Sequence, residues 1–91
     1  MLICKNYTAY KCSNIKTFSN GLVQGIKFKI LEPVTPIEIA KLFEGTTFYF
    51  FDEETNNRMV ETNDKELVGL NITYNDDSTL DITIKLTRRS D

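Results

Sequence analysis

Residues 80 to 87 (LDITIKLT) show the most regular pattern in the chain, because apolar and polar residues alternate at every position. This period of two predicts a β-strand that buries one face. A second apolar run, residues 67 to 74, precedes it, and the tract Asn75-Asp76-Asp77-Ser78-Thr79 between the two runs supplies turn-forming side chains. We therefore expect a closing hairpin in which Ile82 and Ile84 belong to the core.

The segment Ile26-Lys27-Phe28-Lys29-Ile30 alternates in the same way, which predicts a strand whose two lysines point outward. The dipeptide Asn20-Gly21 precedes this segment and favours a type I′ turn, so we expect a tight hairpin there. Val23 and Ile26 are three residues apart, so on a regular strand their side chains would point to opposite faces. If both face the core, Gly25 is the natural place for a β-bulge.

One helix is predicted, and it begins in the segment TPIE. Thr35 is suited to the N-cap, Pro36 to the first helical position, and Glu38 to the third, where it completes a capping box. Apolar residues follow, and Gly45 provides the stop. We expect a short helix near Pro36 to Glu44.

Four aromatic residues follow the helix in succession: Phe48, Tyr49, Phe50 and Phe51. Residues 46 to 51 are rich in β-branched and aromatic types, which predicts a strand, and apolar side chains on both faces suggest a central one. Such residues are usually buried, but a small sheet with one helix cannot easily cover both its faces. The four aromatic residues are therefore an alternative protein-binding interface. Residues 52 to 57 then form a turn.

These elements predict an α+β fold, with one short helix packed on an antiparallel sheet of about five to seven strands. The 91 residues, 41% of them apolar, suit a single domain spanning 1–91. No apolar run approaches the roughly 20 residues that a membrane-spanning helix needs. The N-terminal residues lack the apolar region of a secretory signal, so we expect the protein in the cytoplasm of the cell that makes it.

The composition argues against an enzyme. There is no histidine, no Gly-x-Ser-x-Gly elbow and no glycine-rich phosphate loop. Cys4 and Cys12 have no histidine to activate them, and two sulfurs cannot complete the four ligands of a zinc site. We expect both cysteines to be buried free thiols, and we predict no catalytic residue, no metal and no cofactor.

The acidic turn after the aromatic run has a partial likeness to a calcium-binding loop. Asp52, Glu54 and Asn56 occupy its first, third and fifth positions. The sixth position is Asn57 where glycine is needed, and the twelfth is Asn63 where a bidentate glutamate is needed. We interpret the turn as a solvated hairpin.

Charge is unevenly distributed along the chain. The first 31 residues contain five lysines and no acid, a charge of +5, whereas the remainder holds all 13 acids against six bases, a charge of −7. Lysines on a strand can simply keep it soluble and its edge unpaired. The alternative is a basic surface that binds an acidic partner, and its candidate residues are Lys5, Tyr7, Tyr10, Lys11, Lys16, Lys27 and Lys29.

A resemblance bears on function. From Val34 onward, a capped helix leads through LFEG into an aromatic strand, a turn, a strand and the hairpin NITYNDDSTLDITIKL. This pattern resembles small β-rich proteins encoded by phages and prophages of Gram-positive bacteria, and it covers about two thirds of the chain. The resemblance implies a non-enzymatic role, either in building a virion or in binding a host protein.

Two functions follow as expectations. The first is a structural or assembly protein, associated with a phage head or tail, that binds copies of itself or a neighbouring subunit in the host cytoplasm or the virion. The second is an inhibitor that binds a host defence protein. Nucleic-acid binding is a third alternative, because cations and stacking rings are combined in one stretch, formed by Lys5, Tyr7, Tyr10, Lys11 and Lys16. The acidic remainder of the chain argues against it.

Overall fold

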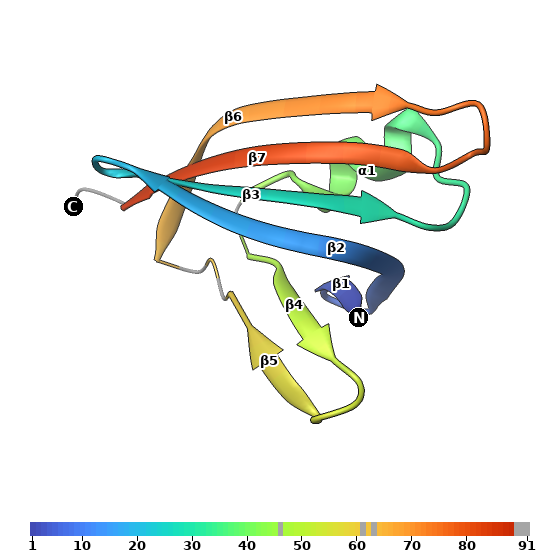
Figure 1. Ribbon diagram of the computed structural model, residues 1–91, viewed down its shortest axis with the longest axis horizontal. Coiled ribbons are helices and arrows are strands. Elements are labelled where there is room, and N and C mark those ends of the chain that lie inside the picture. Colours follow the sequence, from blue (N-terminus) through green and yellow to red (C-terminus); the bar gives the residue numbers. More distant parts are fainter. Residues whose placement is uncertain (46, 61, 63, 89–91) are drawn as a thin grey trace.

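The structure is a computed structural model that describes residues 1–45, 47–60, 62 and 64–88. These residues form one helix and a sheet of seven strands in the order β5-β4-β1-β2-β3-β7-β6, in which every neighbouring pair is antiparallel. The α+β fold class and the expected strand number are therefore confirmed (Figure 1). The elements are β1 (Leu2–Lys5), β2 (Thr8–Asn20), β3 (Val23–Ile30), α1 (Pro36–Leu42), β4 (Tyr49–Asp52), β5 (Asn57–Met59), β6 (Lys65–Tyr74) and β7 (Leu80–Arg88).

Strand β2 is shared by two parts of the sheet. Its first residues pair with β1, up to Lys11 opposite Leu2, and its later residues pair with β3, from Cys12 opposite Ile30. The register with β3 shifts between Ser13 and Lys16, a β-bulge that bends the strand. The bend turns β1, β4 and β5 steeply away from the layer formed by β2, β3, β7 and β6 (Figure 1).

The core lies where these two parts of the sheet and the helix meet. The alternating apolar side chains of β3 and β7 point into it, and Ile82 and Ile84 are buried as expected. Phe28 of β3 packs edge-on against Phe50 of β4 with ring centroids 5.0 Å apart, and Phe43 packs in the same way against Phe48 at 5.4 Å. Four rings thus connect the two parts of the sheet, and such edge-to-face geometry is favourable for aromatic pairs.

The helix begins as the sequence predicts and ends earlier. Thr35 is the N-cap, and its hydroxyl accepts a hydrogen bond from the Glu38 backbone N–H at 3.3 Å. The helix ends at Leu42 rather than Glu44, and Gly45 takes a positive φ of 72° just beyond it. Ile39 and Leu42 are buried, so the helix covers one end of the core with a single apolar face.

The hairpin between β2 and β3 is confirmed, but its turn is not the expected one. Asn20 pairs with Val23, so the two loop residues are Gly21 and Leu22. Gly21 has a φ of 64° and Leu22 is not among the residues with positive φ, which is the arrangement of a type II′ turn. A glycine at the first loop position is what that turn requires.

The bulge expected at Gly25 is wrong. Strand β3 pairs with β7 without interruption from Val23 to Ile30, so Val23 and Ile26 lie on opposite faces. Only Ile26 enters the core. The register shifts of the sheet lie instead on β2, between Ser13 and Lys16, and on β6, between Leu67 and Gly69.

The aromatic strand β4 lies inside the sheet, between β5 and β1, as expected of a central strand. The expected strand began at Thr46, which lies outside the described residues. Phe48 precedes the strand and is held by buried Thr62, whose hydroxyl donates to the Phe48 carbonyl at 2.9 Å and accepts from its N–H at 3.2 Å. The buried polar side chain thus satisfies both backbone groups of Phe48.

Replacing Phe50 with alanine tests the connection between the two parts of the sheet. Phe50 is fully buried, so we expect Phe50→Ala to lower the free energy of unfolding by about 3–5 kcal/mol. Urea denaturation measures this loss. Leu22→Ala is the control, because Leu22 is 90% exposed and its loss should change stability by about 0.5 kcal/mol or less. Equal effects of the two substitutions would contradict the core described here.

Candidate interaction surfaces

The seven residues proposed as a basic partner-binding surface do not form one surface. Lys16, Lys27 and Lys29 lie together on the outer face of β2 and β3, where Lys16 is directly opposite Lys27. Lys5 and Tyr10 lie instead beside α1, Lys5 at its end and Tyr10 at its first turn. Tyr7 is fully exposed in the turn between β1 and β2, and Lys11 lies on the first part of β2.

The outer face of β2, β3, β7 and β6 carries two rows of side chains. The first row, read across the strands, is Lys16, Lys27, Thr83 and Asn71; the second is Phe18, Gly25, Lys85 and Gly69. Sequence reasoning missed Lys85, because it lies far along the chain in the acidic part. Its alternation with Ile84 and Leu86 was the available signal that it points outward. We call these eight residues the outer-face patch.

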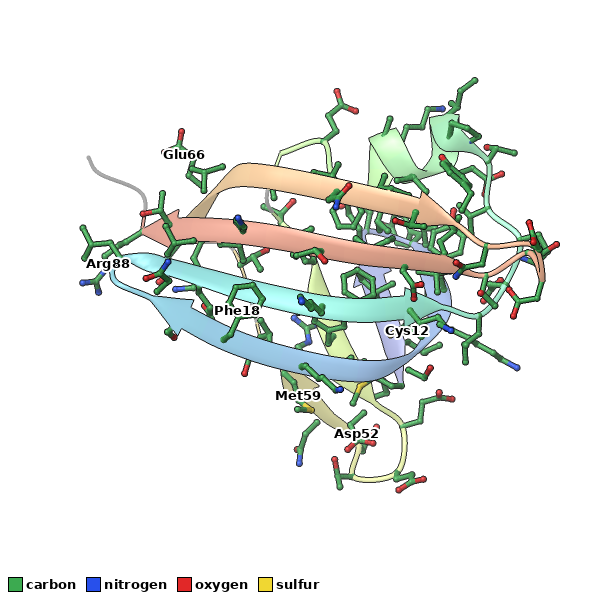
Figure 2. The ribbon with its side chains drawn as sticks, turned by 45° about the horizontal axis from the view of Figure 1, so that its top comes forward. Cys12, Phe18, Asp52, Met59, Glu66 and Arg88 are labelled. Atoms are coloured by element: carbon green, nitrogen blue, oxygen red, sulfur yellow. The ribbon has the colours of Figure 1, made fainter. Side chains whose placement is uncertain are left out.

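Phe18 is the aromatic residue of this patch, and it lies on the outward face of the sheet (Figure 2). Its ring lies over Gly25, so close that a Cβ atom on Gly25 would come within 2.0 Å of a ring carbon. Glycine at position 25 is therefore what allows the ring to lie against β3. The Lys27 ammonium is 5.7 Å from the ring centroid, within reach of a cation–π contact.

The patch is hollowed along its centre. A shallow depression of about 520 Å³ is lined by Phe18, Lys27, Gly69, Leu70, Asn71, Thr83 and Lys85. Gly69 lacks a side chain where Lys85 crosses it, and the atoms of Lys85 would be 3.4 Å from a Cβ at that position. The depression is open to solvent and carries positive charge on two sides.

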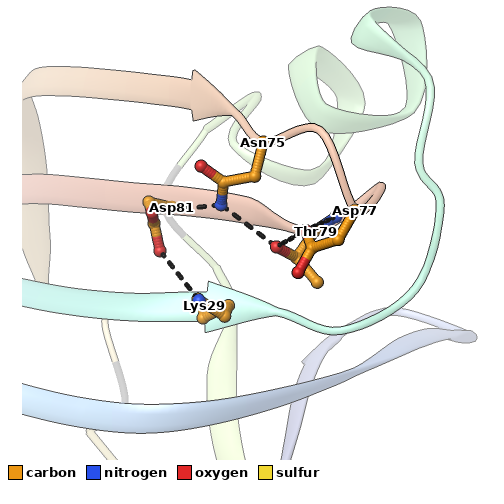
Figure 3. A network of polar contacts seen from close by, with 5 residues as sticks. All are labelled: Lys29, Asn75, Asp77, Thr79 and Asp81. Carbon is orange, nitrogen blue, oxygen red and sulfur yellow. Dashed lines mark hydrogen bonds and ion pairs between the residues drawn. The ribbon is translucent and has the colours of Figure 1, made fainter.

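Lys29 lies on the same face of the sheet, outside the outer-face patch, and its charge is partly neutralised. Its ammonium lies 4.0 Å from the Asp81 carboxylate, and Asp81 accepts a hydrogen bond from the Asn75 amide at 3.1 Å (Figure 3). The same Asn75 amide donates to Thr79, whose hydroxyl and N–H donate to Asp77. These hydrogen bonds from Thr79 lower the pKa of the Asp77 carboxyl. The contacts order the β6–β7 turn.

Lys5 and Tyr10 attach the helix to the sheet. The Lys5 ammonium donates to the carbonyl oxygens of Lys41, at 3.0 Å, and of Glu44, at the C-terminal end of the helix and just beyond it. The Tyr10 hydroxyl donates to the Glu38 carboxylate at 3.4 Å. Burial, and then the Glu38 charge, raise the pKa of Tyr10. These two residues thus have structural partners within the chain.

Two cations of the N-terminal part of the chain lie beside acids from the remainder. Lys29 lies beside Asp81, the N-terminal amine lies 3.3 Å from Glu53, and the Lys11 backbone N–H donates to Glu32 at 2.7 Å. The uneven distribution along the sequence therefore does not produce separate basic and acidic ends.

The aromatic run does not present four side chains to solvent. Phe48 is 1% exposed and Phe50 is fully buried, so neither can contact a partner in this fold. Tyr49 and Phe51 are half-buried, and the Arg58 guanidinium stacks 4.2 Å from the centroid of Tyr49. The alternative interface formed by all four residues is wrong for Phe48 and Phe50, because the bent sheet closes over them.

The edge strand β6 was not among the proposed sites, yet it exposes three large apolar side chains. Val68 is 53%, Leu70 43% and Tyr74 54% exposed. Leu70, Ile72 and Tyr74 pair with Ile84, Ile82 and Leu80 and therefore lie on the core side of the sheet, at its margin. No residue from Gly69 to Tyr74 is charged. The sequence predicts this segment only as one strand of the closing hairpin and does not predict that it lies at an edge of the sheet.

The opposite edge of the sheet, β5, is built differently. It has three residues, Asn57 to Met59, and carries a charged side chain, Arg58. Short length and a charge are two common devices that keep an edge strand from pairing with another chain. Met59 is its exposed apolar residue, at 40%, and β5 lies at the other end of the strand order from β6.

Neither cysteine has the environment of a reactive thiol. Cys4 and Cys12 are free and buried. Burial raises the pKa of Cys4 above its usual value and raises that of Cys12 to about 12. Within the described ranges, no group of three or more cysteine, aspartate or glutamate side chains is arranged to hold a metal ion.

Comparisons with known proteins add no relative: no family model, curated sequence or solved structure matches the chain. In the part of the chain that the structure describes, no helix has the length and apolar character to cross a membrane. Function must therefore be inferred from the surfaces described above.

The thiol of Cys12 should make stability depend on alkaline pH. In the unfolded chain it ionises near its usual pKa of 9.0, but in the folded protein only near 12. The contribution of the neutral thiol to the free energy of unfolding is complete below pH 9. It is lost as the pH rises towards 12, since only the unfolded thiol releases its proton in that interval. Urea denaturation across this range should show a steeper decline for wild type than for Cys12→Ala. Parallel pH profiles would contradict the buried, neutral thiol.

Proposed function

We propose that this protein is a non-enzymatic interaction module that associates with copies of itself through edge strand β6. The observation that carries the proposal is the uncharged segment from Gly69 to Tyr74, which combines a free sheet edge with the exposed side chains of Leu70 and Tyr74. An unpaired edge presents a row of backbone N–H and C=O groups that can extend the sheet into another chain.

The ends of β6 limit where pairing can occur. Lys65 and Glu66 lie at its beginning, followed by the bulge between Leu67 and Gly69. Charges and bulges discourage pairing. The six residues from Gly69 to Tyr74 have neither, so a partner strand fits there.

A second copy suits this edge because the segment is self-complementary. In an antiparallel, two-fold pairing centred on Ile72, Leu70 lies opposite Tyr74 of the second copy, and Asn71 lies opposite its Thr73. Aromatic and aliphatic side chains are favourable cross-strand neighbours, worth about 0.2–1 kcal/mol per pair. Because no charged residue lies between Gly69 and Tyr74, no like charges are brought together.

In biological terms, the proposal is an assembly component of a phage or prophage, acting in the host cytoplasm or in the virion. Its support is the sequence resemblance together with the free β6 edge. A head-to-tail contact, in which the basic strands of one copy meet the acidic loops of another, would be driven by charge. It is less favoured, because Lys29 already lies beside Asp81 and the N-terminal amine beside Glu53. A monomer that binds a host defence protein is the competing function, and the oligomeric state separates the two.

A lysine at position 70 tests the proposal. Leu70→Lys places a charge opposite Tyr74 twice in each dimer, so we expect the dissociation constant to rise at least about tenfold. Sedimentation equilibrium over a range of protein concentrations measures this change. Because the contact is apolar, the wild-type constant should change little when salt is raised.

Met59→Lys is the matched control, because it adds the same charge at a similarly exposed position on the opposite edge. It should leave association unchanged. A wild type that is monomeric at every concentration would refute self-association and favour the host-protein inhibitor. Association that weakens with salt and with Lys27→Glu, but not with Leu70→Lys, would instead establish the head-to-tail contact.

A further inference from the structure

We propose that the outer-face patch binds single-stranded nucleic acid, with Phe18 as a stacking platform for a base and Lys16, Lys27 and Lys85 as contacts for phosphates. The inference does not depend on self-association, since one chain contains the whole patch. It shares Lys16 with the sequence-based nucleic-acid alternative but replaces the other residues of that alternative with Phe18, Lys27 and Lys85.

The first argument is unneutralised positive charge. Lys16 and Lys27 are directly opposite each other on neighbouring strands, an arrangement that is destabilising by itself. Lys85 lies two residues beyond Thr83, the residue opposite Lys27, and is therefore a diagonal cross-strand neighbour of Lys27. In a β-sheet the backbones of such residues are about 7–8 Å apart. None of the three forms an ion pair with any residue that the structure describes. In a chain of net charge −2, this local concentration of cations favours an anionic ligand.

The second argument is the position of the Phe18 ring. One face of the ring covers Gly25, and the side chain remains 38% exposed. The exposed part of the ring can receive the flat surface of a base, an interaction that tolerates any sequence. The Lys27 ammonium lies over the ring, 5.7 Å from its centroid, and Lys85 follows Gly25 in the same row. Cations therefore flank the ring, as a ligand with a charged backbone requires.

The ring also distinguishes between anionic partners. An acidic protein segment would use the lysines but has no flat base to place on Phe18. A single strand uses both, and the polar side chains of Asn71 and Thr83, which line the same depression, supply hydrogen-bonding groups beside it. The observations therefore favour nucleic acid over an acidic peptide.

The test uses the full chain and a fluorescent oligothymidylate of about 12 nucleotides. Fluorescence anisotropy measures the binding. Wild type should bind, and Phe18→Leu should weaken binding about tenfold, because leucine still covers Gly25 but offers no ring. With three phosphate contacts, affinity should fall about 20-fold between about 50 and about 200 mM salt. Lys27→Gln and Lys85→Gln should each weaken binding and reduce this salt dependence by about one third.

Lys41→Gln is the charge-matched control. Lys41 lies on α1, which covers the core side of the sheet, so its loss should leave affinity unchanged. Thermal melts of each variant separate weak binding from unfolding. Absence of binding by folded wild type at low salt would overturn the proposal. So would binding that Phe18→Leu leaves intact and that polyglutamate competes away, because the patch would then recognise negative charge alone.

Discussion

The bend in β2 brings Phe28 of β3 and Phe50 of β4 into edge-on contact, and the rest of the structure depends on that closure. Without the bulge between Ser13 and Lys16, β1 and β4 would continue the plane of β3, and the aromatic run would face solvent on one side. With the bulge, the two parts of the sheet cover each other's apolar faces, and α1 needs to cover only one end of the core.

This closure determines which surfaces remain for partners. The apolar residues on the core side of β3 and β7 are buried, so the outer face and the edges are the surfaces that a partner can reach. Of the two edges, β5 is short and carries Arg58, whereas β6 is long and uncharged over its second half. The β6 edge and the outer-face patch can be used at the same time. Antiparallel pairing of two β6 strands would leave both outer-face patches on the same side of one continued sheet.

Features that depend on local pattern could be predicted from the sequence. The alternation of residues 80 to 87, the Thr35 N-cap and the β2–β3 hairpin each need only a few neighbouring residues. The face of the sheet on which Val23 lies could not be predicted, since it depends on whether β3 contains a bulge at Gly25. In the structure Gly25 instead leaves room for the ring of Phe18 on the neighbouring strand. The patch itself was missed because Lys85 and Lys27 meet only through the pairing of β3 with β7, which charge order along the chain does not reveal.

Hydrogen exchange of the β6 amides tests most directly the claim that this edge is where the molecule meets its partner. In a monomer, the amides of an edge strand that point away from β7 exchange readily. The account predicts that protection of residues 69 to 74 increases with protein concentration, while protection of the β5 edge does not change. Protection of residues 69 to 74 that is independent of concentration would contradict it.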